Sequence, residues 1–214
     1  MNKMAKTKNK ILDAAEVLFA EHGFSGTSLR IITSVADVNL AAVNYHFGSK
    51  KVLIQAVIDR YFNTFTEHLE LEFAAFNNQQ KPLTTKLLLE SLIVPILRLN
   101  DIRPDGAATF MRLLSHAYTE TQGHLKAFLT EKYGYLLIQF TDLVHEANPQ
   151  IDNREMFWRL HFMLGTFVFA FAGHQALSEI AEADFEEKVD ATGIARHLIQ
   201  FLTAAMQPTL KENM

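Results

Sequence analysis

Apolar residues recur with a period close to 3.6 in nearly every long stretch of this 214-residue chain, and no convincing run alternates with period two. A period of 3.6 is the repeat of one helix face, whereas half-buried strands repeat every second residue. The first such stripe lies in a helix predicted over 7–22 and consists of Ile11, Ala14, Ala15, Leu18 and Phe19. The pattern therefore predicts an all-α fold of about nine helices.

Capping residues and helix breakers set the expected limits of the helices. Gly23 should end the first helix, and Pro95 should kink the helix that contains it. The turn 103–106, the polar stretch 77–81 and the acidic stretch 182–187 should separate helices. The other predicted helices are 27–36 capped by Thr27, 39–47 capped by Asn39, 49–73 capped by Ser49, 82–99 with Pro82 in its first turn, 107–118, 122–147, 153–177 capped by Asn153, and 190–208 capped by Asp190.

Composition limits the classes of protein that this chain can be. Hydrophobic residues make up 49% and charged residues 21%, as in ordinary globular proteins, and there is no cysteine for a disulfide or thiolate site. The most apolar run, 162–173, is shorter than the roughly 20 residues that cross a bilayer. No apolar signal-peptide segment follows the basic N-terminal residues. We therefore expect a cytoplasmic protein with no membrane partner.

The net charge of −4 argues against a general nucleic-acid binder, but its distribution is uneven. Residues 1–51 carry seven basic and four acidic side chains, a net charge of +3, and the rest of the chain carries −7. A basic end on an acidic body permits a local phosphate-binding face. A charged N-terminal tail on an ordinary protein would give the same pattern.

Two short helices joined by a four-residue turn, over about 28–47, have the spacing of a helix-turn-helix. In this motif the second helix enters the major groove by its N-terminal end. The turn 36–39 needs a residue that tolerates positive φ, and Asp37 is one of the few non-glycine types that do. The alternative is a plain helical hairpin whose exposed side chains bind nothing.

The second helix of this pair has an inward and an outward face. Leu40, Val43 and Phe47 are predicted to pack inward. Lys50 and Lys51, which start the next helix, place positive charge where a phosphate could bind. The outward face combines small residues that admit base edges with side chains that can bond to bases or phosphates, namely Ala41, Ala42, Asn44, Tyr45 and His46.

The segment 23–50 resembles the DNA-binding domain of TetR-family regulators along its whole length. The Tyr-His-Phe triplet at 45–47, followed by Lys50, is the most specific mark of the resemblance. Asp37 stands where the family usually has glycine and Asn39 where it often has serine, and both can do the same structural job. The resemblance implies a DNA-binding domain over 1–51 and a larger helical domain over 52–214 that binds an effector and dimerises.

The same resemblance implies a homodimer that reads a near-palindromic operator in double-stranded DNA. It singles out the hydroxyls before the first helix of the pair, the outward face of the second helix and the lysines that follow. The candidate DNA-binding residues are Thr27, Ser28, Arg30, Asn39, Ala41, Ala42, Asn44, Tyr45, His46, Lys50 and Lys51.

A narrower resemblance extends beyond the DNA-binding domain. The blocks 31–34, 39–51, 110–114, 122–125 and 157–165 are similar to the PsrA-type regulators. That branch is associated with long-chain fatty acids and with control of β-oxidation genes. It implies a repressor that a long-chain fatty acid or acyl-CoA releases from its operator.

Seventeen phenylalanines and seven methionines suit an adaptable apolar cavity, although a core and a dimer interface also need such side chains. The stretch around 162–171 is apolar nearly all round, so its own domain or a partner must cover it. The candidate ligand-binding residues are Phe110, Met111, Arg112, His116, His161 and Phe162. The candidate dimer-interface residues are Phe167, Phe169 and Phe171.

Other chemistries lack a recognisable motif. No two of the nine histidines form a close i, i+4 pair, and there is no phosphate-binding glycine loop and no nucleophile elbow. We therefore expect no catalytic residue, cofactor or metal site, and no enzyme. Two alternatives stay open: a small all-α enzyme or lipid carrier with an incidental hairpin, and a TetR-type regulator with a different effector or none.

Overall fold

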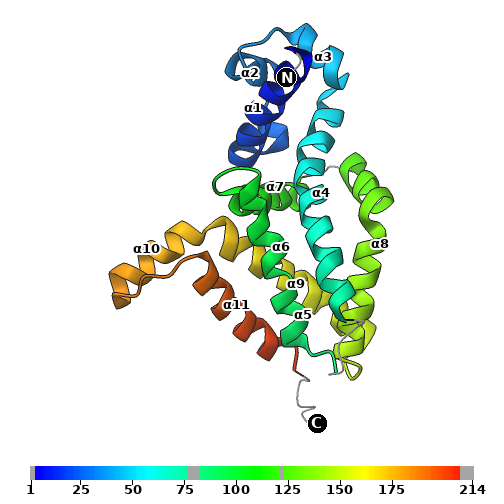
Figure 1. Ribbon diagram of the computed structural model, residues 1–214, viewed down its shortest axis with the longest axis vertical. Coiled ribbons are helices and arrows are strands. Elements are labelled where there is room, and N and C mark those ends of the chain that lie inside the picture. The colour runs from blue at the N-terminus through cyan, green and yellow to red at the C-terminus, as the bar shows by residue number, and fades with distance from the viewer. Residues whose placement is uncertain (1–2, 77–81, 121–122, 208–214) are drawn as a thin grey trace. The chain divides into compact units, whose positions relative to one another are not determined.

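The structure is a computed structural model that describes residues 3–76, 82–120 and 123–207 (Figure 1). Helices are the only regular elements in these ranges, as the sequence predicts. Contacts between residues divide the chain into two units, each described here by itself: unit 1 is Met1–Thr64 and Leu99–Gly134, and unit 2 is Phe65–Arg98 and Tyr135–Met214. These units cut the chain differently from the functional domains 1–51 and 52–214, whose division stays a prediction.

Unit 1 contains the helix-turn-helix and the helices packed behind it. Phe19 and Phe24 meet edge to face with ring centroids 5.4 Å apart and are both fully buried. Helix α1 packs against both α2 and α7. The elements are α1 (Lys3–Gly26), α2 (Leu29–Val35), α3 (Leu40–Phe47), the first half of α4 (Lys50–Phe76), a 3-10 helix (Leu99–Asp101), α7 (Gly106–Thr119) and the first half of α8 (Gly123–Ala147).

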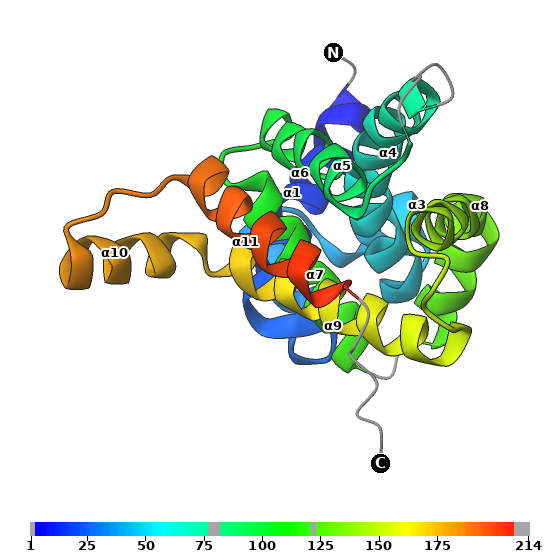
Figure 2. The same cartoon turned by 90° about the horizontal axis from the view of Figure 1, so that it is seen from below.

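Unit 2 is built on α11, which packs against α9 and α5 (Figure 2). Phe167 and Phe171 stack inside it with ring centroids 6.2 Å apart. Helix α10 extends away from the other helices of this unit and has no buried residue (Figures 1 and 2). The unit also holds the second halves of α4 and α8, and its own helices are α5 (Thr85–Ser91), α6 (Ile93–Arg98), α9 (Asn153–Ala172), α10 (His174–Phe185) and α11 (Ala191–Ala205).

The single helix predicted over 82–99 is wrong, because the chain forms α5 and α6 with a break at Leu92. Pro95 has no N–H to donate to a carbonyl one turn earlier, so it fits only the first turn of a new helix. Pro82 precedes α5, which begins after Thr84, whose hydroxyl accepts the N–H of Leu87. Leu92 keeps right-handed helical angles, φ −78° and ψ −21°, so the interruption lies one turn before Pro95, where a proline is expected to disturb a helix.

The helix predicted over 153–177 is also broken. Its cap is Asp152 and not Asn153, since the Asp152 carboxylate accepts the N–H groups of Arg154 and Glu155. Helix α9 ends at Ala172, and α10 leaves Gly173 at an angle of 72°. Because α10 continues to Phe185, the loop predicted over 182–187 is wrong for most of its length.

These breaks raise the count to eleven α-helices in the described residues, where we expected about nine. Asp190 caps α11 as predicted. The predicted linker 77–81, helix start at 122 and helix end at 208 touch positions outside the described residues. Within the described ranges no single helix has the length and apolar character to cross a bilayer, and the bent pair α9–α10 meets that test by length and composition alone.

Candidate nucleic-acid interface

The turn between α2 and α3 has the geometry that the sequence predicts. Asp37 adopts φ +52°, in the left-handed region. Asn39 caps α3, because its side-chain oxygen accepts the N–H of Ala42 at 2.9 Å. Helix α2 differs from expectation, since its cap is Ser28, whose hydroxyl accepts the N–H of Ile31 at 3.3 Å. Side-chain caps thus fix the start of both short helices.

Helix α3 turns one face to the core and one to solvent. Val43 and Phe47 are buried as predicted, but Leu40 is exposed, which corrects its inward assignment. Tyr45 is 73% exposed, and its ring meets the ring of His46 edge to face at 5.1 Å. The other outward candidates are Ala41 and Asn44, which are exposed, and Ala42, which is half-buried like His46.

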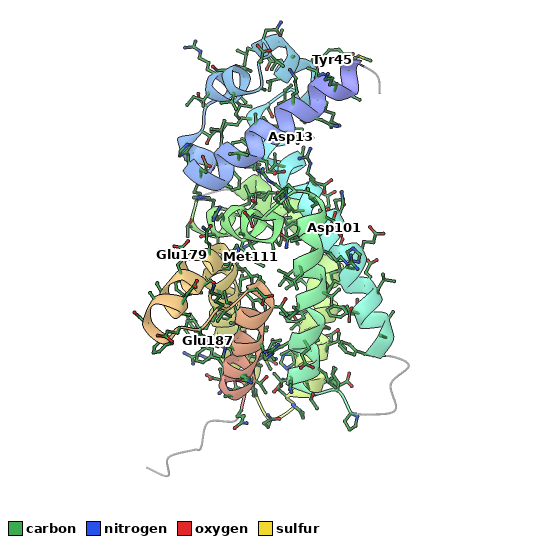
Figure 3. The ribbon with its side chains drawn as sticks, turned by 60° about the vertical axis from the view of Figure 1, so that its left-hand side comes forward. Asp13, Tyr45, Asp101, Met111, Glu179 and Glu187 are labelled. Atoms are coloured by element: carbon green, nitrogen blue, oxygen red, sulfur yellow. The ribbon has the colours of Figure 1, made fainter. Side chains whose placement is uncertain are left out.

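The first turns of α1 lie beside α3, a contact that the sequence did not predict. The hydroxyl of Tyr45 donates to the sulfur of Met4 at 3.7 Å, and Figure 3 shows Tyr45 beside this end of α1. The ammonium group of Lys8 lies 5.9 Å from the centre of the Phe47 ring. Lys6 and Lys10 are exposed on the same helix. Four lysines lie within residues 3–10 and are the sequence signal for a basic surface on this helix. In the sequence they contribute only to the net charge of residues 1–51.

The lysines after α3 start the next helix. Gly48 has φ +71°, and its N–H bonds to the carbonyl of Asn44, which ends α3 within one residue. The hydroxyl of Ser49 then accepts the N–H of Val52, so α4 begins at Lys50. Lys50 is half-buried, and Lys51 is exposed. Ser28 and Arg30, at the start of α2, are also exposed.

Thr27 is not available to DNA, which corrects its place among the candidate contacts. Its side chain is 1% exposed. Its hydroxyl lies 2.8 Å from the carbonyl oxygen of Gly23 and 3.0 Å from that of Leu18. Thr27 therefore ties the end of α1 to the start of the helix-turn-helix.

A buried carboxylate joins α1 to α4 and to the turn before α7. Glu16 is 2% exposed, and it accepts hydrogen bonds from Arg60 at 3.0 Å and from Arg103 at 2.7 Å. Arg60 also donates to Asp13 at 2.7 Å. Burial alone would lower the pKa of Arg60, but the hydrogen bonds and charges of the two carboxylates outweigh it and raise that pKa. Sequence periodicity gave no sign of this cluster.

The candidate ligand residues do not form one group. Phe110 and Met111 are buried in unit 1, and Figure 3 places Met111 in the interior. Arg112 is exposed, so it does not line that interior, and His116 contacts Glu120. His161 and Phe162 belong to unit 2, where both are exposed. Of the six candidates, only Phe110 and Met111 are buried, while His116 is half-buried and the other three are exposed.

An aromatic cluster surrounds Phe110 in unit 1. Its ring centre lies 5.8 Å from that of Tyr61 and 5.3 Å from that of Phe62. Phe62 in turn stacks on Tyr133 at 5.0 Å, and the Tyr133 hydroxyl donates to Asp59 at 2.6 Å. The candidate Phe110 therefore lies at the centre of a largely apolar set drawn from α4, α7 and α8.

The three candidate dimer-interface residues differ in how deeply they are buried. Phe171 is 1% and Phe167 4% exposed, so both belong to the core of the protomer, which corrects their assignment. Phe169 is 67% exposed. Its neighbours on the same face of α9 are residues at intervals of four, three and four, and α11 adds one more exposed ring. The exposed residues on this side of α9 are Trp158, Phe162, Gly165 and Phe169, and Phe201 is exposed on α11; these five residues are called the α9/α11 face below.

Two family models match the chain. Residues 11–57 match “Bacterial regulatory proteins, tetR family”, and residues 90–205 match “Tetracyclin repressor-like, C-terminal domain”. YttP, a candidate HTH-type transcriptional regulator of Bacillus subtilis, is 37% identical over 91 residues, which is 42% of either chain. The biofilm operon icaADBC negative transcriptional regulator IcaR of Staphylococcus epidermidis is 34% identical over 62 residues, 29% of this chain and 34% of IcaR. The matched segments therefore span less than half the length of these relatives.

Solved structures share the fold over nearly the whole chain. The match with HlyIIR, a hemolysin II transcriptional regulator, covers 94% of this chain and 99% of HlyIIR, at 21% identity and a TM-score of 0.63. The match with a Clostridium perfringens protein, described as a candidate fatty acid metabolism regulator, covers 94% of this chain and 100% of that protein, at 16% identity and a TM-score of 0.61. TetR-family members are DNA-binding regulators, which sets aside the enzyme and lipid-carrier alternatives. The chain belongs to the TetR family of transcriptional regulators.

Proposed function

We propose that this regulator binds a near-palindromic operator as a homodimer, represses the adjoining genes, and is released by a long-chain fatty acid or acyl thioester. The observation that carries the DNA-binding part is α3, a capped helix whose exposed face presents Ala41, Asn44 and Tyr45. The repressor part is supported by IcaR, whose name describes negative regulation. The division into a DNA-binding domain (1–51) and an effector and dimerisation domain (52–214) belongs to the same proposal.

The chemistry of α3 fits sequence reading in the major groove. The small side chain of Ala41 admits base edges, and the Asn44 amide can bond to adenine. Tyr45 and the half-buried His46 can each reach a base or a phosphate. Lys50 and Lys51 would neutralise phosphates, and Ser28 and Arg30 could bond to the backbone that flanks the groove. Because α3 is one of a pair in a dimer, the two copies should read half-sites about one helical turn, roughly 34 Å, apart.

The α9/α11 face supports the homodimer. Monomeric proteins seldom leave several large aromatic rings exposed on one continuous face. Trp158, Phe162 and Phe169 follow one side of α9, so a second copy related by a two-fold axis could cover them with the same residues. We therefore assign Phe162 to the dimer interface and not to a ligand site.

The effector is supported by three observations of different kinds. The PsrA-like blocks point to long-chain acyl compounds. A structural neighbour is described as a candidate fatty acid metabolism regulator. The aromatic cluster around Phe110, with Met111 beside it, offers an apolar lining that an acyl chain could enter between α4, α7 and α8. A ligand releases DNA only if it binds the released state more tightly than the DNA-bound state.

The test is a gel-shift experiment on genomic fragments, with and without acyl ligands of increasing length. We expect one or a few fragments to bind and to be released. Release should strengthen about fourfold per added methylene, since each buried CH₂ contributes about 0.8 kcal/mol, until the cavity is full. Release that ignores chain length would indicate detergent action. Specific binding without release would favour a TetR-type regulator with another effector or none, and absence of specific binding would contradict the proposal.

A further inference from the structure

The chain leaves the helical path at the end of α1, just before the helix-turn-helix begins. Gly23 has φ +75° and ψ 171°, although residues on both sides are helical. The break frees the N–H groups of Phe24 and Ser25 from bonds within α1. Both groups point to a side chain about 95 residues away, Glu120, which follows the last turn of α7.

Glu120 binds this break with both of its oxygens. One oxygen accepts the N–H of Phe24 at 2.9 Å and lies 3.3 Å from Nδ1 of His116. The other accepts the N–H of Ser25 at 2.7 Å and the Ser25 hydroxyl at 2.6 Å. We call this arrangement the Glu120 clasp. Hydrogen bonds from backbone N–H groups to a carboxylate are stronger than those between neutral groups.

The close fit of the clasp requires glycine at 23. A Cβ added to Gly23 would lie 2.3 Å from a Glu120 oxygen and 3.0 Å from Nδ1 of His116. The positive φ would itself be strained for any other residue. The ring of Phe24 packs edge to face on His116 at 6.2 Å, so apolar contact reinforces the polar one. Helices α1 and α7 are thus joined at this point by closely fitting polar and aromatic contacts.

The clasp is connected to the recognition helix by a short series of bonds. Phe24 and Ser25 are followed by Thr27, whose hydroxyl returns to the Gly23 carbonyl, and then by Ser28, which caps α2. Helix α2 braces α3. Movement of α7 relative to the Gly23 break would therefore move the start of α2.

We propose that Glu120 is a positioning residue for operator binding, which orients the helix-turn-helix on α7 without touching DNA. This inference rests on the proposed DNA-binding function. The alternative roles of Glu120 are a surface charge and a fold-stabilising contact. These three roles predict different changes in operator affinity when Glu120 is replaced, and different dependence of that affinity on salt.

The experiment compares Glu120→Gln with Glu21→Gln, measured by fluorescence anisotropy on a selected operator fragment. Glu21 lies exposed on α1 of the same unit and takes no part in the clasp. Both variants remove one negative charge from the DNA-binding unit, which by electrostatics alone strengthens binding to DNA. We expect Glu21→Gln to bind equally well or more tightly. We expect Glu120→Gln to bind about 5- to 30-fold more weakly, because its amide nitrogen would face N–H donors.

Two further measurements separate positioning from folding and from phosphate contact. Glu120→Asp keeps the charge but is one methylene too short to hold both N–H groups, so we expect it to weaken binding as well. The slope of log Kd against log salt should stay that of the wild type in both variants, because no phosphate contact is lost. Circular dichroism should show wild-type helix content, while hydrogen exchange at the amides of Phe24 and Ser25 should speed up about tenfold or more.

The possible outcomes distinguish a failure of the proposed function from a failure of the positioning role. If the wild type binds no operator, the proposed function fails. If the wild type binds and Glu120→Gln or Glu120→Asp binds as tightly, the positioning role is wrong. Weaker binding with a reduced salt slope would mean that cationic contacts to phosphate are lost, and weaker binding with lost helix content would make Glu120 a folding contact. Either result overturns the inference.

Discussion

The buried Glu16 cluster allows a prediction whose magnitude follows from the structure. Glu16→Gln removes the carboxylate to which Arg103 donates at 2.7 Å, while Arg60 keeps Asp13. Breaking a fully buried pair by removing one partner costs about 3 to 5 kcal/mol. The side chains of Arg60 and Arg103 are 24% and 35% exposed, so solvent screens part of this cost. We therefore expect unfolding free energy to fall by about 2 to 3 kcal/mol.

The matched control is Asp13→Asn, which removes a carboxylate from the same Arg60 guanidinium at a site 63% exposed. Exposed ion pairs contribute about 0 to 1 kcal/mol, so this variant should unfold nearly as the wild type does. Urea unfolding is followed by circular dichroism at equal protomer concentration, because dimerisation shifts apparent stability. With a slope of about 2 kcal/mol per molar urea, the Glu16→Gln midpoint should fall by about 1 M. Equal midpoints for the two variants would refute the role assigned to the buried carboxylate.

Four other outcomes are expected. Tyr45→Ala should abolish specific operator binding in a gel shift while circular dichroism stays unchanged, and wild-type affinity would show that α3 is not the reading helix. Lys51→Ala should weaken binding to all sequences and reduce the slope of log K against log salt by about 0.9, whereas an unchanged slope would exclude a phosphate contact. Phe169→Glu should yield folded monomer in light scattering, while Phe171→Glu should unfold unit 2; a dimeric Phe169→Glu would contradict the α9/α11 face. Partial burial raises the pKa of Glu120, but bonds from Ser25 and Phe24 and the His116 charge outweigh it and lower that pKa. The stability that the clasp adds is thus fully present above the usual carboxyl pKa and is lost as the pH falls through the lowered pKa. The urea midpoints of wild type and Glu120→Gln should therefore converge in acid and stay different above neutrality.

Local chemistry made the helix-turn-helix predictable. Asp37 tolerates positive φ and Asn39 caps α3 because of their own side chains and nearest neighbours, so neighbouring sequence contains the required information. The break at Gly173 was missed for the opposite reason. Apolar residues continue through it with helical spacing, and periodicity cannot show where a helix bends. Leu40 was misplaced because the first turn of a short helix projects beyond the core it would cover.

Contacts between distant residues could not be predicted. Glu120 and the Phe24 amide are 96 residues apart, and Glu120 carries no motif. Phe167, Phe169 and Phe171 lie on a helix that is apolar nearly all round, so the sequence could not tell which rings fill the protomer and which are left for a partner. Thr27 was taken for a DNA contact because threonine serves equally well as a cap, a phosphate ligand or an internal tie, and only its burial decides.

The most direct test of the central claim is a footprint of the wild-type protein on its selected genomic fragment, repeated with Tyr45→Ala and with Tyr135→Ala. Tyr135 is another exposed tyrosine, 53% exposed, and lies in unit 2. We predict two protected major-groove segments about one helical turn apart, present for wild type and Tyr135→Ala and absent for Tyr45→Ala. Protection that survives in Tyr45→Ala, or that covers the fragment without preference for any sequence, would contradict the claim that α3 reads an operator.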